Sequence, residues 1–244
     1  MKLLLILICV LSAISCKASE CNRDIDLLSK YIHVPIHCQS VKTTGLISGT
    51  RPTDGELNAA YRSLLSFGAS YNKDFISHNA REINLLHNLS YQKIIVGGLS
   101  TGNSIYLNIK DDINDQKFLD FIYIRALHHE FSSSIYRRTS YENKRKWRMI
   151  SGKYKESSGY LRKCLEDTVF AREINDELLK NGFLNNYSMT DSENDFNVFA
   201  EEMFTEPVKL ERKETKYYSI RQKTNLLKKI YIEAGFTGKF PDEP

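Results

Sequence analysis

The sequence predicts an α+β fold, in which several helices pack on a small sheet to form one domain over residues 51–244. Three observations support this prediction. Several segments repeat apolar residues at helical spacing, and two short segments between them have the composition of strands. The chain is also long enough for a core, and its hydrophobic and charged fractions of 41% and 26% are those of a globular domain.

Residues 1–15 have the pattern of a secretory signal peptide. Lys2 precedes an apolar run over residues 3–11 that is too short to span a bilayer, and the small residues Ala13 and Ser15 come before Cys16. Cleavage before a cysteine resembles processing of a bacterial lipoprotein, in which lipid is attached to that cysteine. We therefore expect an exported protein that is anchored to a membrane of the cell envelope through Cys16. Secretion without a lipid is the alternative.

Residues 16–50 are polar and mixed, which predicts a lipid-anchored tether followed by an irregular segment. An exported compartment permits a disulfide between Cys21 and Cys38, although the spacing alone does not decide whether it forms. With that disulfide, Cys164 would be a buried free thiol.

The first helix of the domain is predicted to begin at residues 52–56, because Thr53 and Glu56 have the spacing of a capping box. Its apolar residues recur at helical spacing from Leu57 to Phe67, and the helix is expected to end near Gly68. A second helix is predicted over residues 72–87.

Two strands and a long helix follow. Residues 93–96 are a short apolar run that ends at two glycines, and residues 104–109 alternate between apolar and polar side chains. Residues 115–138 are predicted to form one helix, in which a stripe from Phe118 through Arg125 continues along the same face to His129 and Ser133. Three later helices are predicted over residues 165–179, 195–204 and 217–234.

The segment over residues 137–163 is basic, with ten Lys and Arg against two Glu. We interpret it as a solvated segment near an anionic membrane surface or another polyanion. Binding of nucleic acid is not expected, because the net charge of the whole chain is only +4.

The sequence from His128 to Ser134 reads His-His-Glu-Phe-Ser-Ser-Ser. In the H-E-x-x-H motif, two histidines four residues apart bind Zn²⁺ from one helix face, and the Glu acts as general base. His129 and Glu130 match this motif, but Ser133 stands where the second histidine would be. No G-x-S-x-G or P-loop motif points to another chemistry.

The order of elements and this motif resemble the zincin-like domain of the zinc-binding metallopeptidases found among bacterial lipoproteins, over roughly residues 55–205. The resemblance implies an edge strand before the active helix that binds an extended peptide, for which we expect residues 104–109. It also implies a third zinc ligand from a downstream segment that ends in F-A-E, here residues 195–204. In that alignment the position of the third ligand holds Asn197.

The resemblance implies a set of site residues. Glu130 would be the general base, His129 a zinc ligand, and Glu201, one turn beyond Asn197, a substitute ligand or a partner of one. His128 could join the metal only if the helix were distorted, and is otherwise a hydrogen-bonded core residue. Because Ser and Asn are poor zinc ligands, we expect weak zinc binding.

Two functions follow from this site. One is an exported, peptide-hydrolysing metallopeptidase with an altered zinc site. The other is a catalytically inactive pseudo-protease that binds a peptide or a protein of the envelope.

Overall fold

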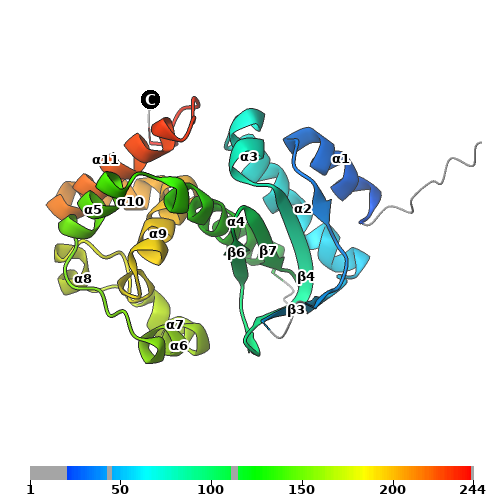
Figure 1. Ribbon diagram of the computed structural model, residues 1–244, viewed down its shortest axis with the longest axis horizontal. Coiled ribbons are helices and arrows are strands. Elements are labelled where there is room, and N and C mark those ends of the chain that lie inside the picture. Colours follow the sequence, from blue (N-terminus) through cyan, green and yellow to red (C-terminus); the bar gives the residue numbers. More distant parts are fainter. Residues whose placement is uncertain (1–20, 43–45, 111–114, 243–244) are drawn as a thin grey trace, which may run out of the picture.

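The structure is a computed structural model that describes residues 21–42, 46–110 and 115–242. It has the predicted α+β fold. One part holds the sheet and helices α1–α4, and the other part, built from α5–α11, lies beside α4 (Figure 1). The predicted signal peptide and Cys16 lie outside the described residues. Within them, no helix is long and apolar enough to cross a membrane.

The main sheet has the strand order β2-β3-β4-β7-β6, with β1 and β5 paired to the two ends of β4. β4 is parallel to β7 and to β1, and antiparallel to β3 and β5, and β6 is antiparallel to β7. The strands are β1 (Ile36–His37), β2 (Val41–Lys42), β3 (Ile47–Thr50), β4 (Glu82–Tyr91), β5 (Ile94–Ile95), β6 (Gly98–Thr101) and β7 (Ser104–Asn108).

The central strand β4 was predicted as part of a helix, and that prediction is wrong. Helix α3 spans only Lys73–Asn79, and the chain then extends at Ala80. Ile83 and Leu85 belong to the main core, whereas Leu86 and Leu89 belong to a small cluster that includes Val96 from the loop after β5. A strand buried on both faces loses the simple alternation of apolar and polar residues, so its sequence is easily taken for a helix.

The predicted edge strand is also corrected. β7, the strand expected at the edge, pairs with β4 on one side and β6 on the other. The edge of the sheet is β6, which begins at the glycine pair that was predicted to end a strand. Gly102 has a φ of 57° in the turn between β6 and β7, a conformation that glycine adopts without strain. The hairpin made by this turn places β6 outside β7.

Residues 21–42 and 46–50 are not the irregular segment that the sequence predicted. They form α1 (Arg23–Ile32) and strands β1–β3, so the folded domain begins before residue 51. Asn22 caps α1 through its side chain, and the buried Cys21 and Cys38 form a disulfide. Cys164 is a buried free cysteine, as expected.

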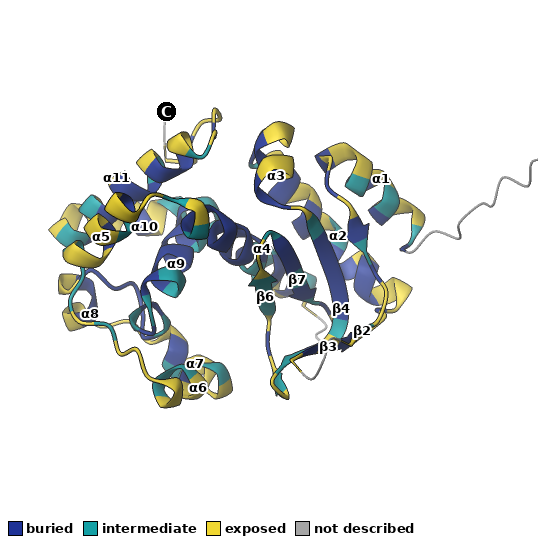
Figure 2. Ribbon diagram, viewed as in Figure 1, coloured by how far each residue is buried: buried dark blue, intermediate teal, exposed yellow. Residues whose placement is uncertain are grey.

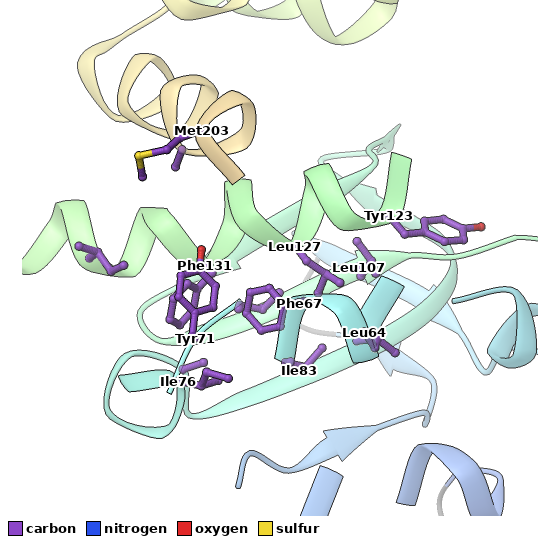
Figure 3. Packing of buried hydrophobic residues seen from close by; sticks show 14 of the residues in the cluster. Leu64, Phe67, Tyr71, Ile76, Ile83, Leu107, Tyr123, Leu127, Phe131 and Met203 are labelled. Carbon is purple, nitrogen blue, oxygen red and sulfur yellow. The ribbon is translucent and has the colours of Figure 1, made fainter. Parts of the chain in front are cut away.

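The main core lies between the sheet, α2 (Asp54–Ala69) and α4 (Gln116–Arg138) (Figure 3). The predicted capping box starts α2: Thr53 accepts from the backbone of Glu56, whose carboxylate accepts in return from the Thr53 backbone. Phe67 of α2 and Phe131 of α4 are fully buried against each other. This packing fixes α4 over the sheet and thereby fixes the site residues that α4 carries.

The second part is helical. Its helices are α5 (Tyr141–Ile150), α6 (Ser158–Glu166), α7 (Thr168–Arg172), α8 (Asp176–Lys180), the 3₁₀-helix η1 (Tyr187–Met189), α9 (Ser192–Thr205), α10 (Pro207–Lys216) and α11 (Tyr218–Glu233). The helix predicted over 165–179 is therefore three short helices, because Asp167 and Asn175 each cap a new one. The basic segment contributes to α4, α5 and α6 and is largely exposed (Figure 2).

Candidate functional site

The predicted juxtaposition of α4 and α9 is confirmed. The two helices pack closely, with His129 and Ser133 on the face of α4 that meets α9. α9 begins at its cap Asp191, and its buried residues Phe196, Phe199 and Met203 belong to the main core. The site is therefore held by two helices that are both anchored in that core.

The two positions that would hold the missing zinc ligands are joined to each other. The Asn197 amide nitrogen donates to the Ser133 hydroxyl over 2.6 Å, and the Ser132 hydroxyl donates to the Asn197 amide oxygen over 2.7 Å. All three side chains are buried, with Asn197 only 1% exposed. Since buried polar groups are costly to leave unpaired, this closed set of hydrogen bonds stabilises the α4–α9 contact.

The His129 ring is held in position by the Glu201 carboxylate. Its Nδ1 donates to Glu201 Oε1 over 2.5 Å, and Glu201 Oε2 accepts two further hydrogen bonds from Arg125 at 2.7 and 2.9 Å. Arg125 also binds Glu206 at 2.6 Å, so four charged groups form one partly buried chain. Sequence reasoning missed Arg125 and Glu206, although Arg125 lies one turn before His129 on the same face.

The ion pairs determine the protonation states of these linked side chains. Burial alone would lower the pKa of His129, but its hydrogen bond to Glu201 and the charges of Glu130 and Glu201 outweigh burial and raise that pKa to about 9. Burial opposes ionisation of Glu201, yet Arg125 and His129 lower its pKa to about 2. At neutral pH the site therefore holds an imidazolium against a carboxylate.

Glu130 turns toward the edge strand. Its carboxyl lies so close to Gly98 that a Cβ at that position would come within 2.8 Å of Glu130 Oε1. Burial raises the pKa of Glu130 to about 6, while His129 and a hydrogen bond from Ser100 act in the opposite direction. The carboxyl is thus poised to exchange a proton near neutral pH, as a general base would be.

His128 is not part of the site. It lies on the other side of α4, where its Nδ1 is 2.7 Å from the Tyr71 hydroxyl and its ring stacks on Phe204. Burial lowers its pKa to about 3. α4 continues through this position without a break, so His128 and His129 cannot share a metal ion. The prediction of His128 as a metal ligand is wrong, and the core alternative holds.

A cleft of about 260 Å³ opens in front of His129 and Glu130. One wall is the edge of the sheet, the floor is α4, and the other wall comes from α6, α7, the chain before α9 and α9 itself. Tyr187 brings its ring to 5.7 Å from that of His129. The lining is mostly apolar around a charged floor: Ile95, Val96, Gly97, Gly98, Ile122, Arg125, Ala126, His129, Glu130, Cys164, Leu165, Thr168, Ala171, Arg172, Asn185, Tyr187, Val198 and Glu201.

These residues do not fit a zinc ion. A catalytic zinc needs three protein ligands, and only His129 remains of the set implied by the motif. Ser133 and Asn197 are bonded to each other, and both Glu201 oxygens are occupied by His129 and Arg125. Among the described residues, no group of three or more His, Cys, Asp or Glu is placed to hold a metal ion.

Comparison with known proteins identifies the scaffold. None of the curated proteins compared with the chain matches it. The crystal structure titled "a putative zinc-binding metallo-peptidase" from Bacteroides caccae has a similar fold, with a TM-score of 0.55 and 17% identity over 87% of this chain and 85% of that one. A family model described as "Putative zinc-binding metallo-peptidase" matches residues 66–234. Because that match covers well over half of the sequence, the chain belongs to this metallopeptidase family.

Proposed function

We propose that this chain is a non-hydrolytic member of its family, a pseudo-protease that binds a peptide segment of a partner protein in the cleft between β6, α4 and the α6–α7 pair. The observation that carries the proposal is the hydrogen bond between Asn197 and Ser133. It joins the positions of the two missing ligands and fills the space between them. Zinc-dependent activation of water needs those ligands, whereas binding of a peptide does not.

The edge strand supports binding of an extended peptide. Asn108 donates from its backbone to the Gly97 carbonyl, so alternation along the β6–β7 ladder turns the backbone groups of Gly98 and Ser100 away from β7. Arg137 donates to the Ser100 carbonyl from the outer side, which agrees with this alternation. A peptide could therefore add to the edge at Gly98 and place an apolar side chain in the cleft.

The second candidate is a hydrolase with an altered metal site. This candidate is favoured by the Glu201 carboxylate at His129 Nδ1, because a metal-binding histidine commonly donates the N–H of its other ring nitrogen to a carboxylate. It is also favoured by Glu130, whose pKa of about 6 suits a general base. A bound zinc would supply an activated water, but one imidazole is too few ligands to hold it.

Zinc binding separates the two candidates. We expect the purified protein to contain no stoichiometric zinc and to show no tight binding in calorimetric titration. Ser133→His with Asn197→Glu restores the full ligand set and should give tight binding, and Ser133→His alone an intermediate affinity. His129→Ala in the double variant is the matched control and should abolish that binding. Tight binding by the natural protein that is lost in His129→Ala would overturn the proposal.

We further propose that the protein is an exported lipoprotein of a bacterial envelope, attached to its membrane through Cys16. The support is the sequence of residues 1–16 and the Cys21–Cys38 disulfide, since disulfides form in exported compartments. Mass spectrometry of the native protein should show Cys16 as a lipid-modified N-terminus. Retention of residues 1–15 in the mature protein would contradict export altogether.

A further inference from the structure

α1 carries an unusual stripe on its outer face. Arg23, Leu27, Lys30 and Tyr31 follow the spacing i, i+4, i+7 and i+8, and all four are exposed. Figure 2 shows α1 with exposed segments along its ribbon. Leu27 is 53% exposed and Tyr31 44% exposed. The opposite face of the helix is formed by Ile25, Leu28 and Ile32, which are buried in the main core. The four residues of the stripe therefore lie outside the buried core.

The composition of the stripe suits the surface of a bilayer. A tyrosine and a leucine can lie at the level of the lipid headgroups, while the long stems of Arg and Lys reach the phosphates. Lys73 of α3 adds a third cation, with its ammonium 4.6 Å from the centre of the Tyr31 ring. Asp24 and Asp26 border the stripe on its two sides, so the three cations exceed these two acids by one charge.

The chain enters the domain at a fixed point beside this stripe. Cys21 is buried and bonded to Cys38, and Asn22 both caps α1 and hydrogen-bonds to Asn58 of α2. From Cys16 to Cys21 there are five residue steps, which span at most about 18 Å when fully extended. A lipid on Cys16 would hold the first turn of α1 within that distance of the membrane.

We infer that α1 lies against the lipid bilayer, with the stripe of Arg23, Leu27, Lys30 and Tyr31 among the headgroups. This inference rests on the proposed lipid attachment at Cys16. The lipid supplies the membrane affinity, because one short helix face buries too little apolar surface to bind alone, and the stripe sets the orientation. In Figure 1 the sheet lies between α1 and the α6–α7 pair that borders the cleft, and β6, which also borders it, is the edge strand of that sheet. The cleft would thus open away from the membrane.

Quenching of tryptophan fluorescence tests this orientation. The lipidated full-length protein is reconstituted in vesicles of phosphatidylethanolamine and phosphatidylglycerol whose acyl chains are brominated near the headgroup. The natural Trp147 is 0% exposed and gives a constant background. We expect the emission added by Leu27→Trp to be quenched in these vesicles. Val169→Trp on α7, where the native side chain is 84% exposed, is the matched control and should keep its emission.

The outcomes distinguish a failure of this orientation from a failure of the proposed lipid attachment at Cys16. If Cys16 carries lipid and the protein is bound to vesicles, but Leu27→Trp and Val169→Trp are equally unquenched, the orientation is wrong and the lipoprotein proposal stands. Stronger quenching of Val169→Trp would mean that the cleft side faces the membrane, which also overturns the inference. If Cys16 carries no lipid, both fall together.

Discussion

At the scale of single residues, the site is held together by partly buried ion pairs. Arg125 forms ion pairs with both Glu201 and Glu206, and Glu201 also pairs with His129, so two cations face two carboxylates. The ion pair between Arg125 and Glu201 is mostly buried, with side chains 9% and 13% exposed. In such a pair the cost of losing one partner exceeds the net contribution of the pair, because the remaining charge stays buried. We therefore expect this series of ion pairs to stabilise the fold.

We predict that Arg125→Met lowers the free energy of unfolding by about 3 kcal/mol, the lower end of the cost of breaking a buried ion pair. Arg145→Met is the matched control: Arg145 makes an ion pair with Glu142 in which both side chains are half-exposed. The control should change stability by less than about 0.5 kcal/mol. Urea unfolding of both variants measures the difference, and equal effects would show that the buried chain has no special role.

The pairing of His129 also makes stability depend on pH. Its pKa is raised from 6.5 to about 9 in the folded state. Its contribution to the free energy of unfolding is therefore complete below pH 6.5 and is lost as the pH rises through 9. We predict that stability falls between these values by at most about 3 kcal/mol. Glu130 titrates near pH 6, below this window. His129→Gln should flatten the fall in a series of urea titrations, and an unchanged slope would refute the assignment.

At the scale of elements, the sequence predicted the helices that carry the site better than the strands around it. α4 and α9 were correctly predicted as helices, and His129 was correctly predicted to face residues 195–204, although residues 127–136 of α4 are buried on every side of the helix. The capping box at the start of α2 was also correctly predicted from the sequence. β4 was missed because both of its faces are buried, and the edge was misplaced because only the hairpin at Gly102 reveals that β6 lies outside β7.

A second buried pair joins two helices of the second part. Lys223 of α11 and Asp195 of α9 are both fully buried, and Asp195 also accepts from Trp147 at 2.8 Å and from Tyr154 at 2.6 Å. The Asp195 carboxylate points into this cluster and not toward His129. No local pattern could reveal that, because its cation lies 28 residues further along the chain.

We predict that Lys223→Met lowers the free energy of unfolding by about 3–5 kcal/mol, because Asp195 is left charged in a dry environment. Adding Asp195→Leu should recover part of this loss, since the uncompensated charge is then removed. Thermal or urea unfolding of the single and double variants measures this coupling. If the two single substitutions have additive effects in the double variant, Lys223 and Asp195 act independently and the prediction is wrong.

The disulfide acts at the same scale, because it fixes where α1 joins the rest of the fold. Cys21 and Cys38 are 17 residues apart, and a closed loop of that length is associated with about 3 kcal/mol of stability. We predict that Cys21→Ser with Cys38→Ser lowers the unfolding free energy by about this amount. Amide exchange should show that α1 loses more protection than α9. Uniform loss across both helices would contradict a local role for the disulfide.

At the scale of the whole molecule, the cleft depends on two parts of the chain that meet only in the folded state. The glycines of the edge strand come from one part, and Leu165 and Ala171 of the α6–α7 pair come from the other. The sequence showed the degenerate motif, yet it could not show whether Ser133 and Asn197 left a gap or filled it. Their separation of 64 residues is closed only by the packing of α4 on α9.

Gly98 provides a test of the cleft as a peptide-binding site. A Cβ at this position would meet the Glu130 carboxyl at 2.8 Å, so Gly98→Ala must push that flexible side chain toward the cleft. Gly159→Ala on α6 is the matched control, because a Cβ there meets nothing within 4 Å. Peptides are first selected from a displayed random library against the natural protein. We predict that Gly98→Ala weakens their binding by about tenfold, which corresponds to about 1.4 kcal/mol, and that Gly159→Ala leaves it unchanged. Selected peptides that bind all three proteins equally would place peptide recognition outside the cleft.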